Sequence, residues 1–545
     1  MLDQDLGQLY IIAELWGFEF SALDLKAGIE IILPKLLDPD LISEVIVDLP
    51  VPARNAIDLL IRHSGRFPWP LFSRRYGSLR EMGPGRRDRE KPYLDLNASP
   101  VELLWYRGVI GRAFFDTSEG PLEFVYIPGD LLTLLPVPDD LPRKPLGRLA
   151  VSAERVYSLP VNDWIVDDAC TLLAALRMGM PVKDILKFFR LGHKAYPTPY
   201  PLTSNVLQRL LAAAGLINER GFPDPEPVRI FLESTRSEAL ALLADAWLNS
   251  SDFNELFLIP DLLCEGQWVN NPLQTRHTII DFITVGTQVE EISPGVEPVK
   301  AWTQNLLSLK RDYWSLDGFI SDLHVEYPDF QRPVGDYDSW YIRDRSSGEY
   351  IRGFEHWDVV DGKLVRYMVI GPLHWLGLVH LAAAEVPQKD KVLEITAFRV
   401  SDWAADLLTH KVPQPLQIEE NPIVVDTQAR LVLQSNVPRA VRYQVARFCS
   451  WEYQLDGTYH YRLTPASLEA ARQGGLLVHH LMALLDRYAK VVPPNIIKAL
   501  TQWGKNGSQA RMERHMVLRL SSPDMLSEVR KSRASRFLGD PLGPT

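Results

Sequence analysis

The sequence predicts a mainly α, α+β protein of several domains, and three observations lead to that prediction. Apolar residues recur at three- and four-residue spacing through 204–217 and 235–251, as in amphipathic helices. Three helical patterns end at a glycine that is followed by strand-like residues. Proline is concentrated at 135–147 and 410–422, and such stretches seldom stay inside a domain because proline lacks the backbone donor.

Length and composition describe a chain that can bury several cores. With 545 residues, of which 46% are hydrophobic, about three to five domains of ordinary size are expected. No run approaches the roughly 18 apolar residues of a membrane helix, and the acidic start "MLDQDLGQLY" lacks the basic segment of a signal peptide. We therefore expect a cytoplasmic protein with no membrane partner.

The three cysteines, Cys170, Cys264 and Cys449, are far apart in the sequence. This spacing fits neither a four-thiolate metal site nor a disulfide framework. We expect them to be buried structural residues.

The domain boundaries follow the proline-rich stretches and the ends of the helical patterns. The predicted units are an N-terminal helical, winged-helix-like domain at 1–136, a linker at 137–150, a helical middle region at 151–350 with a winged-helix-like unit near 204–250, a winged-helix-like domain at 351–410, and a C-terminal domain at 420–545.

The winged-helix prediction depends on one plan that occurs three times. Gly108, Gly215 and Gly377 each follow a helical pattern, and glycine at that place allows the left-handed turn that ends a helix. An apolar pair follows each glycine, and a second strand is expected within 123–135, 228–243 or 397–408. A helix, a glycine turn and a two-stranded hairpin together are typical of a winged helix.

Each second strand should lead into a new helix. The side-chain oxygens of Asp130, Ser234 and Ser401 are placed to cap these helices.

The stretch "GPLHWLGLV" at 371–379 is the corner of one such unit. Pro372 is tolerated in a first helical turn, and Trp375 and Leu376 should face the core. His374 is predicted to be a half-exposed packing residue and not a ligand.

Charge is unevenly spread over the chain, whose formal net charge is −11. The first basic cluster, at 73–91, has a net charge of +4, and the second basic cluster, at 505–536, has a net charge of +5. If these clusters bind nucleic-acid phosphates, the contacting residues are expected to be Arg74, Arg75, Arg86, Arg87, Arg511, Arg514 and Arg519. The alternative is that both are solvated arginine-rich loops.

No catalytic motif stands out in the sequence. It lacks the Gly-Lys-Ser/Thr loop that cradles phosphates, and "GPGRRDREK" at 83–91 does not replace it. His479 and His480 are adjacent and point from different helix faces, while Asp336 and Asp338 lack the further ligands of a calcium loop. We expect no cofactor, no metal and no small-molecule substrate.

The C-terminal residues resemble a known family. The stretch at 461–512, "YRLTPASLEAARQGGLLVHHLMALLDRYAKVVPPNIIKALTQWGKNGSQARM", resembles the helicase-associated N-terminal domain of XPB-type DNA helicases, which in bacteria also occurs on proteins without a motor. Matching features are Thr464 and Pro465 at a helix start, Gly474 at its end, "VVPPNI" at 491–496 and a helix ending at Trp503. The segments "FSRRYGSLREMGP" and "WYRGVIGRAFF" look like the N-terminal parts of long bacterial members.

The resemblance implies a non-catalytic attachment to DNA-unwinding machinery. It also leads us to expect a further strand and helix beyond the last residues, "FLGDPLGPT". The leading hypothesis is a non-catalytic accessory that binds DNA or a helicase. The alternative is a protein-interaction scaffold that binds no nucleic acid, and an enzymatic role comes third.

Overall fold

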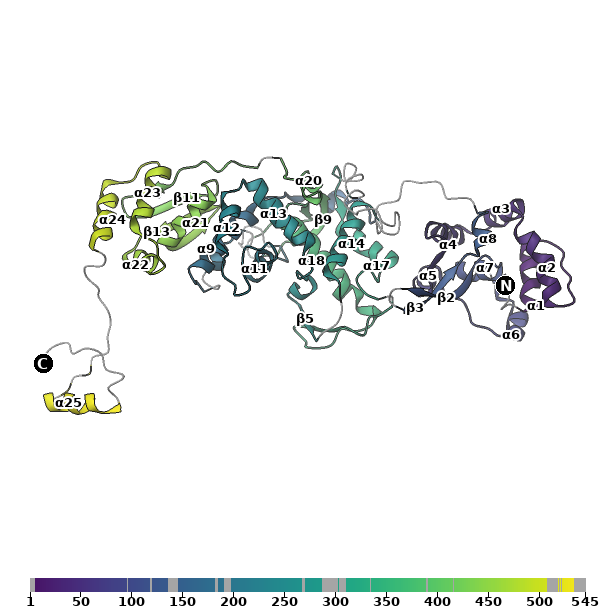
Figure 1. Ribbon diagram of the computed structural model, residues 1–545. Helices are drawn as coiled ribbons and strands as arrows, with labels where there is room; N and C mark the ends of the chain where they lie inside the picture. Colours follow the sequence, from purple (N-terminus) through teal and green to yellow (C-terminus); the bar gives the residue numbers. More distant parts are fainter. Residues whose placement is uncertain are drawn as a thin grey trace.

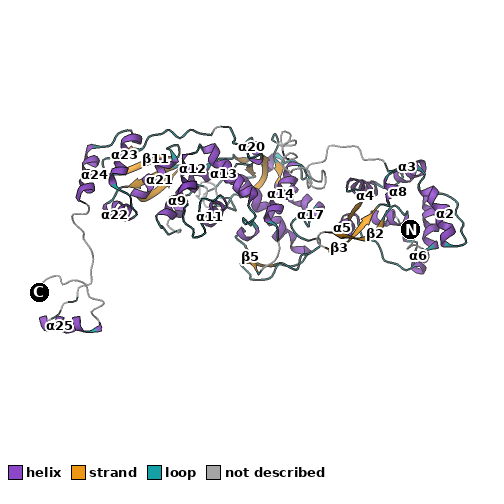
Figure 2. Cartoon of the chain, viewed as in Figure 1, coloured by secondary structure: helices purple, strands orange, loops and turns teal. Residues whose placement is uncertain are grey.

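The computed structural model describes residues 5–95, 97–117, 120–135, 146–181, 185–190, 198–266, 270–286, 302, 310–333, 335–388, 391–414, 416–506, 518, 520 and 522–533. Helices dominate and four small sheets are interspersed among them (Figure 2), so the fold is mixed α and α+β, as predicted. Figure 1 shows the elements following one another from an N-terminal unit at one end to α23 (Val478–Tyr488) and α24 (Pro494–Asn506) at the other.

The N-terminal unit, residues 5–135, has its own apolar core, which extends from Leu9 to Leu135. Its helices and strands are α1 (Leu6–Trp16), α2 (Leu25–Leu36), α3 (Pro39–Val47), α4 (Val51–Arg62), β1 (Arg66–Pro68), α5 (Trp69–Tyr76), α6 (Pro84–Glu90), α7 (Pro100–Tyr106), β2 (Gly111–Thr117), β3 (Gly120–Tyr126) and α8 (Gly129–Leu132). The three strands form an antiparallel sheet in the order β1-β3-β2.

The middle unit comprises the described residues between 146 and 408. Its elements are β4 (Tyr157–Leu159), α9 (Trp164–Arg177), α11 (Ser204–Ala213), α12 (Pro225–Glu233), α13 (Arg236–Asn249), β5 (Leu262–Glu265), α14 (Pro272–Thr284), β6 (Trp314–Ser315), α17 (Leu316–Glu326), β7 (Tyr341–Asp344), α18 (Lys363–Ile370), α19 (Pro372–Trp375), β8 (Val379–Ala383), β9 (Ile395–Val400) and α20 (Ala404–Leu408). One antiparallel sheet has the order β4-β8-β9-β6, and β5 pairs with β7.

The C-terminal domain is described from Ile423, which forms a bridge with Ala489. It contains β10 (Val424–Val425), β11 (Arg430–Gln434), α21 (Arg439–Phe448), β12 (Ser450–Leu455), β13 (Thr458–Arg462), α22 (Pro465–Gln473), α23 (Val478–Tyr488), α24 (Pro494–Asn506) and α25 (Pro523–Lys531). Its sheet has the order β10-β11-β13-β12. The domain shares one apolar core with the middle unit, since a single cluster of buried residues runs from Leu146 to Leu500.

The two predicted helices and the three glycine turns are confirmed. The patterns at 204–217 and 235–251 correspond to α11 and α13. Gly108, Gly215 and Gly377 have φ of 70°, 67° and 82°, the left-handed turns that the sequence required. A side chain at Gly377 would also collide, because its Cβ would lie 2.7 Å from the Trp403 ring.

Two of the three predicted hairpins are present, and the third is wrong. The β2–β3 and β8–β9 hairpins follow Gly108 and Gly377. After Gly215 only an isolated bridge forms, and the predicted second strand at 228 is helix α12. The reason is that Val228, Phe231 and Leu232, at helical spacing, form the buried face.

The predicted helix caps are displaced by one or two residues. Asp130 lies within the first turn of α8. Thr235, not Ser234, caps α13 in a capping box with Glu238. The Ser401 hydroxyl accepts a hydrogen bond from the backbone N–H of residue 403 but does not cap α20.

In the corner at 371–379, Trp375 and Leu376 are buried as predicted. His374 is buried as well, which corrects the half-exposed position expected for it. Its Nδ1 is 2.9 Å from the carbonyl oxygen of Val379, and burial lowers its pKa to about 4.

The predicted domain boundaries stay predictions. The hairpin β8–β9, from the predicted domain at 351–410, shares its sheet with β4 and β6. Residues 136–145, which include most of the predicted linker, lie outside the described residues.

Candidate functional site at the seam of the C-terminal domain

Two arginines of the first basic cluster lie at the contact between the N-terminal unit and the middle unit. On α5, Arg74 donates a hydrogen bond to Asp329 at 3.3 Å and lies 4.6 Å from the centre of the Phe354 ring. The neighbouring Arg75 lies 3.4 Å from Glu326. Both carboxylates belong to the middle unit, so Arg74 and Arg75 join the N-terminal unit to it.

Arg86 and Arg87, the other two candidate arginines of this cluster, pair within the N-terminal unit. Arg86 forms an ion pair with Glu90 one turn later, at 2.8 Å, and its side chain is 59% exposed. The side chain of Arg87 is only 8% exposed and donates to both carboxylate oxygens of Asp5 at 2.9 Å. Although burial raises the pKa of Asp5, the hydrogen bonds from Arg87 bring it below its usual value.

Arg511, Arg514 and Arg519 of the second basic cluster lie outside the described residues. Phosphate binding by either cluster remains a prediction. Of the four candidate arginines that the structure describes, Arg86 has the most exposed side chain.

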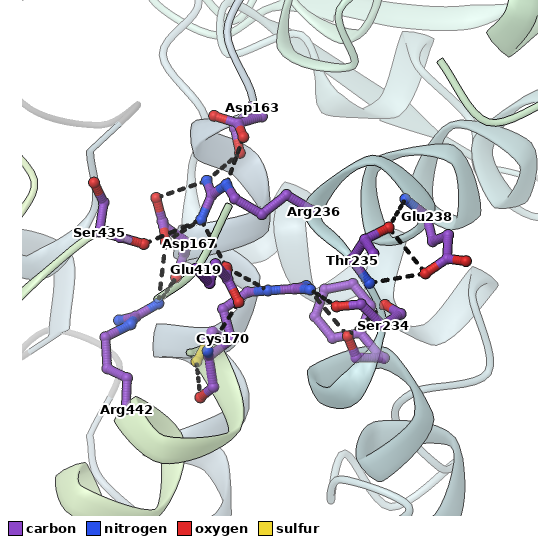
Figure 3. Close-up of polar contacts among 12 residues, drawn as sticks. Asp163, Asp167, Cys170, Ser234, Thr235, Arg236, Glu238, Glu419, Ser435 and Arg442 are labelled. Carbon is purple, nitrogen blue, oxygen red and sulfur yellow. Dashed lines mark hydrogen bonds and ion pairs between the residues drawn. The ribbon is translucent and has the colours of Figure 1, made fainter. Parts of the chain in front are cut away.

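A different set of charged residues gathers at the seam between the middle unit and the C-terminal domain, where α21 packs on α9 (Figure 3). Asp167 of α9 is fully buried. It accepts hydrogen bonds from Arg190 at 2.8 Å and from the two terminal nitrogens of Arg236 at 3.0 and 3.1 Å. Three elements of the middle unit therefore meet at one carboxylate.

Helix α21 brings two further arginines to the seam. Arg442 donates to the carbonyl oxygen of Asp167 at 2.7 Å and to the hydroxyl of Thr171 at 2.9 Å. Arg439 donates to Glu419 at 2.8 Å and to the carbonyl oxygens of Phe231 and Ser234. The helix that opens the C-terminal domain is thus tied to both α9 and α12.

Glu419 closes the network. It lies in the stretch 410–422 and accepts from Arg236 at 3.0 Å as well as from Arg439. Close by, the backbone of residue 416 donates to the Ser237 hydroxyl at 3.0 Å. The predicted interdomain connection is therefore held against α13 and α21 at these points.

We call the residues that meet here the seam network. They are Asp163, Asp167, Asp168, Arg190, Arg236, Glu419, Arg439 and Arg442. Four cations face four carboxylates, so the buried charges are balanced. Burial raises the pKa of Asp167, but the positive charges of Arg236 and Arg442 outweigh it and hold that pKa below its usual value.

Two of the cysteines are buried at or near this seam. Cys170 of α9 lies 3.6 Å from the carbonyl oxygen of Arg439, and burial raises the pKa of its thiol. Cys449 is buried as well, whereas Cys264 is partly buried. The expectation of burial is confirmed for Cys170 and Cys449.

The structure offers no metal centre in its described part, where no group of three or more His, Cys, Asp or Glu side chains is arranged to hold an ion. Asp336 instead accepts hydrogen bonds from the backbone and hydroxyl of Ser339, which closes a turn. Within the described residues, no helix is long and apolar enough to cross a membrane.

Residues 423–540 match the sequence model of a family described as "Helicase conserved C-terminal domain". The match begins at the first strand of the four-stranded sheet and covers less than a quarter of the chain. No curated protein matches this sequence. The chain therefore carries a helicase-associated domain in the region where the sequence resembled one, and the XPB type inferred there stays a prediction. The seam network ties this domain to the middle unit.

Sequence reasoning did not identify the seam network. Its arginines are indistinguishable in sequence from surface arginines, and Arg442 and Asp167 are 275 residues apart. One signal was available: the pair Asp167 and Asp168 interrupts the apolar stretch "WIVDDACTLLAAL" at 164–176. Two carboxylates on a helix that is apolar all round need buried cations.

Proposed function

We propose that this protein is a non-catalytic accessory in DNA transactions, in which an XPB-type helicase-associated domain binds DNA or a helicase. The observation that carries the proposal is the match of residues 423–540 to a helicase C-terminal family. The absence of a phosphate-binding Gly-Lys-Ser/Thr loop from the sequence supports a role without a motor. Such an accessory would act on DNA in the cytoplasm.

The seam network supports a role in which the C-terminal domain is held rigidly on the middle unit. Buried, hydrogen-bonded ion pairs tolerate little displacement, because separating them leaves charges without partners in a medium of low dielectric constant. A force applied to the C-terminal domain would therefore be transmitted to the helices of the middle unit. A domain that positions DNA or a motor needs a rigid mount of this kind.

We propose that DNA contacts the second basic cluster first. Arg511, Arg514 and Arg519 belong to the region that matches the helicase family. Arg86 would add a contact from the first basic cluster, because breaking its exposed ion pair with Glu90 costs little. The pairing of Arg87 with Asp5 would have to open before Arg87 could bind a phosphate.

The test is fluorescence anisotropy of labelled duplex, forked and single-stranded DNA across a salt series. The triple variant Arg511→Glu, Arg514→Glu, Arg519→Glu should weaken binding to all three DNAs. The slope of log K against log salt should fall by about one unit for each phosphate that the variant no longer binds. A control variant with the same charge change, Lys26→Glu, Lys35→Glu, Arg54→Glu, alters exposed residues of the N-terminal unit and should bind as the wild type does.

A second candidate function is a protein-interaction scaffold without nucleic-acid binding. The observation in its favour is that Arg74, Arg75, Arg86 and Arg87 are all paired with carboxylates of the chain itself. The net charge of −11 also disfavours nucleic acid. Absence of salt-dependent binding to any of the three DNAs would reject DNA binding and leave this function standing.

A further inference from the structure

A cleft of about 420 Å³ opens on the surface where the middle unit meets the C-terminal domain. One wall belongs to α12 and the end of α9, and the other belongs to α21 and α23. The floor and walls are mainly apolar and include Val228, Leu232, Val441, Tyr443, Leu484 and Tyr488. Because both units contribute, the cleft exists only while the seam is closed.

Two arginines face this apolar cleft without a neutralising carboxylate. Arg177 is exposed at the end of α9, and Arg447 is half-buried on α21. Arg447 donates a hydrogen bond to the side-chain oxygen of Gln444 at 3.0 Å and lies 5.5 Å from the centre of the Tyr443 ring. In the described part of the chain, neither arginine forms an ion pair.

This arrangement costs free energy in the unoccupied protein. Burial lowers the pKa of Arg447, and the positive charge of Arg177 lowers it further. Elsewhere on the same helix the chain neutralises its cations, since Arg439 meets Glu419 and Arg442 meets Asp167. A half-buried cation that is kept next to a second cation is suited to an incoming anion.

The remaining charges around the cleft do not fill this role. On α12, Arg229 pairs with both Glu226 and Glu233 at 2.6 Å each, so Glu233, which also lines the cleft, is held in an ion pair, although one arginine between two glutamates leaves this group with a net negative charge. Of the charged residues described in the lining, Arg177 and Arg447 are therefore the cations without a paired carboxylate.

We propose that this cleft binds an acidic segment of a partner protein, whose apolar side chain inserts between α12 and α21 while its carboxylates bond to Arg177 and Arg447. An amphipathic segment in an apolar groove is a recurrent mode of peptide recognition. Arginine is suited to this contact because its planar fork binds a carboxylate through two parallel hydrogen bonds.

The chemistry of the cleft favours a peptide over nucleic acid. A nucleic-acid backbone needs a series of cations along its path and gains nothing from an apolar floor. Here two cations face an apolar surface, on a chain whose net charge is −11. The inference rests on the helicase-binding part of the proposed function and names the chemistry by which the partner is recognised.

The experiment starts from a random 16-residue peptide library displayed on phage and panned on the full-length protein. Enriched peptides should carry carboxylates beside large apolar residues. The best peptide is then synthesised with a fluorescent label, and its affinity is measured by anisotropy. Arg447→Glu should weaken peptide binding by about tenfold to a hundredfold, as expected for removing hydrogen bonds between charged groups. Arg177→Glu should also weaken peptide binding.

Two further variants separate the charge from the fold. Leu484→Gln changes a half-buried residue of the apolar floor and should weaken peptide binding without an arginine being touched. Arg472→Glu reverses an exposed arginine of α22 outside the cleft and should bind the peptide as the wild type does. Thermal melting of each variant verifies that it is folded.

Three outcomes overturn the proposal: no enrichment over uncoated beads, enriched peptides without acidic residues, or a best peptide that binds Arg447→Glu as tightly as the wild type. A fourth is displacement of the peptide by a 20-nucleotide single-stranded DNA whose own binding depends on Arg447, which would make the cleft a nucleic-acid site. The DNA-binding measurement on the second basic cluster is independent, so failure of either proposal is recognised separately.

Discussion

Replacing Asp167 by asparagine is the sharpest perturbation of the seam network. The change keeps the shape of the side chain and removes the one fully buried carboxylate that meets Arg190, Arg236 and Arg442. Four cations would then face three carboxylates in the interior, and the new amide N–H₂ would point at a guanidinium. Removing one partner of a buried ion pair typically costs about 3–5 kcal/mol.

That loss should be visible in thermal unfolding. At about 2.1 cal/mol/K of unfolding entropy per residue, a cooperative unit of roughly 300 residues loses about 1.5 °C for each kcal/mol, so the midpoint for the middle unit and C-terminal domain, which share one core, should fall by about 5–7 °C. Differential scanning calorimetry measures the midpoint, and urea unfolding followed by tryptophan fluorescence gives the free energy. The control is Glu90→Gln, which breaks the exposed pair with Arg86 and should leave the midpoint unchanged.

The pH dependence gives the same prediction a second test. Because the pKa of Asp167 is lowered in the folded protein, the unfolded state binds the proton more readily. The stabilisation is therefore complete above the unfolded pKa of about 4 and is lost as the pH falls through the folded value. The difference between wild type and Asp167→Asn should be constant from about pH 8 to 5 and shrink below about pH 4. A midpoint within about 2 °C of the wild type at pH 7.5 would refute the argument that these charges hold the seam together.

Three other predictions follow from particular residues and from the sequence. Arg74→Glu places a like charge against Asp329, so the N-terminal unit should separate and the radius of gyration from X-ray scattering should rise, whereas Arg86→Glu should leave it unchanged. Cys170 and Cys449 should react with a thiol reagent at pH 8 only after unfolding, because burial raises the pKa of both thiols; rapid reaction in the folded protein would contradict this. Purified protein should show no DNA-stimulated ATP hydrolysis above a mock preparation, and turnover that copurifies and disappears on an internal mutation would contradict the non-catalytic proposal.

The parts of the fold that local chemistry determines could be predicted from the sequence. Gly108 and Gly377 ended their helices where expected because a left-handed turn excludes most side chains, whatever the rest of the chain does. Thr464 and Pro465 began α22 for an equally local reason, since the hydroxyl caps the helix and proline needs no donor in its first turn.

The strand predicted at 228–233 was wrong because the apolar residues there fit both the two-residue period of a strand and the period of a helix. Val228, Ile230 and Leu232 alternate as in a strand, while Val228, Phe231 and Leu232 follow a helix. The segment is a helix because that conformation buries Val228, Phe231 and Leu232. Ile230, which a strand would place on the same face as Val228 and Leu232, is 53% exposed. Asp224 followed by Pro225 was a helix-start signal that favoured the observed result.

The seam network and the cleft lay beyond sequence reasoning because they depend on which charges meet in three dimensions. Helix α21 carries Arg439, Arg442 and Arg447 within nine residues, and nothing in "RAVRYQVAR" distinguishes them. In the fold the first two are buried against carboxylates from distant segments, and the third faces the cleft with none.

Helix α21 therefore contributes both to the seam, through Arg439 and Arg442, and to the proposed partner site, through Arg447. Arg439 and Arg442 hold α21 against α9 and α12, and the same placement brings Arg447 into the lining of the cleft together with Arg177. A segment that binds both walls is bound only by the closed seam, so its binding free energy adds to the stability of the seam, by about 2.7 kcal/mol at a hundredfold excess over Kd. A partner would in this way reinforce the connection through which the C-terminal domain transmits force. The uncompensated charge on Arg447 weakens the free protein slightly, and the partner's carboxylate removes that penalty where the two units meet.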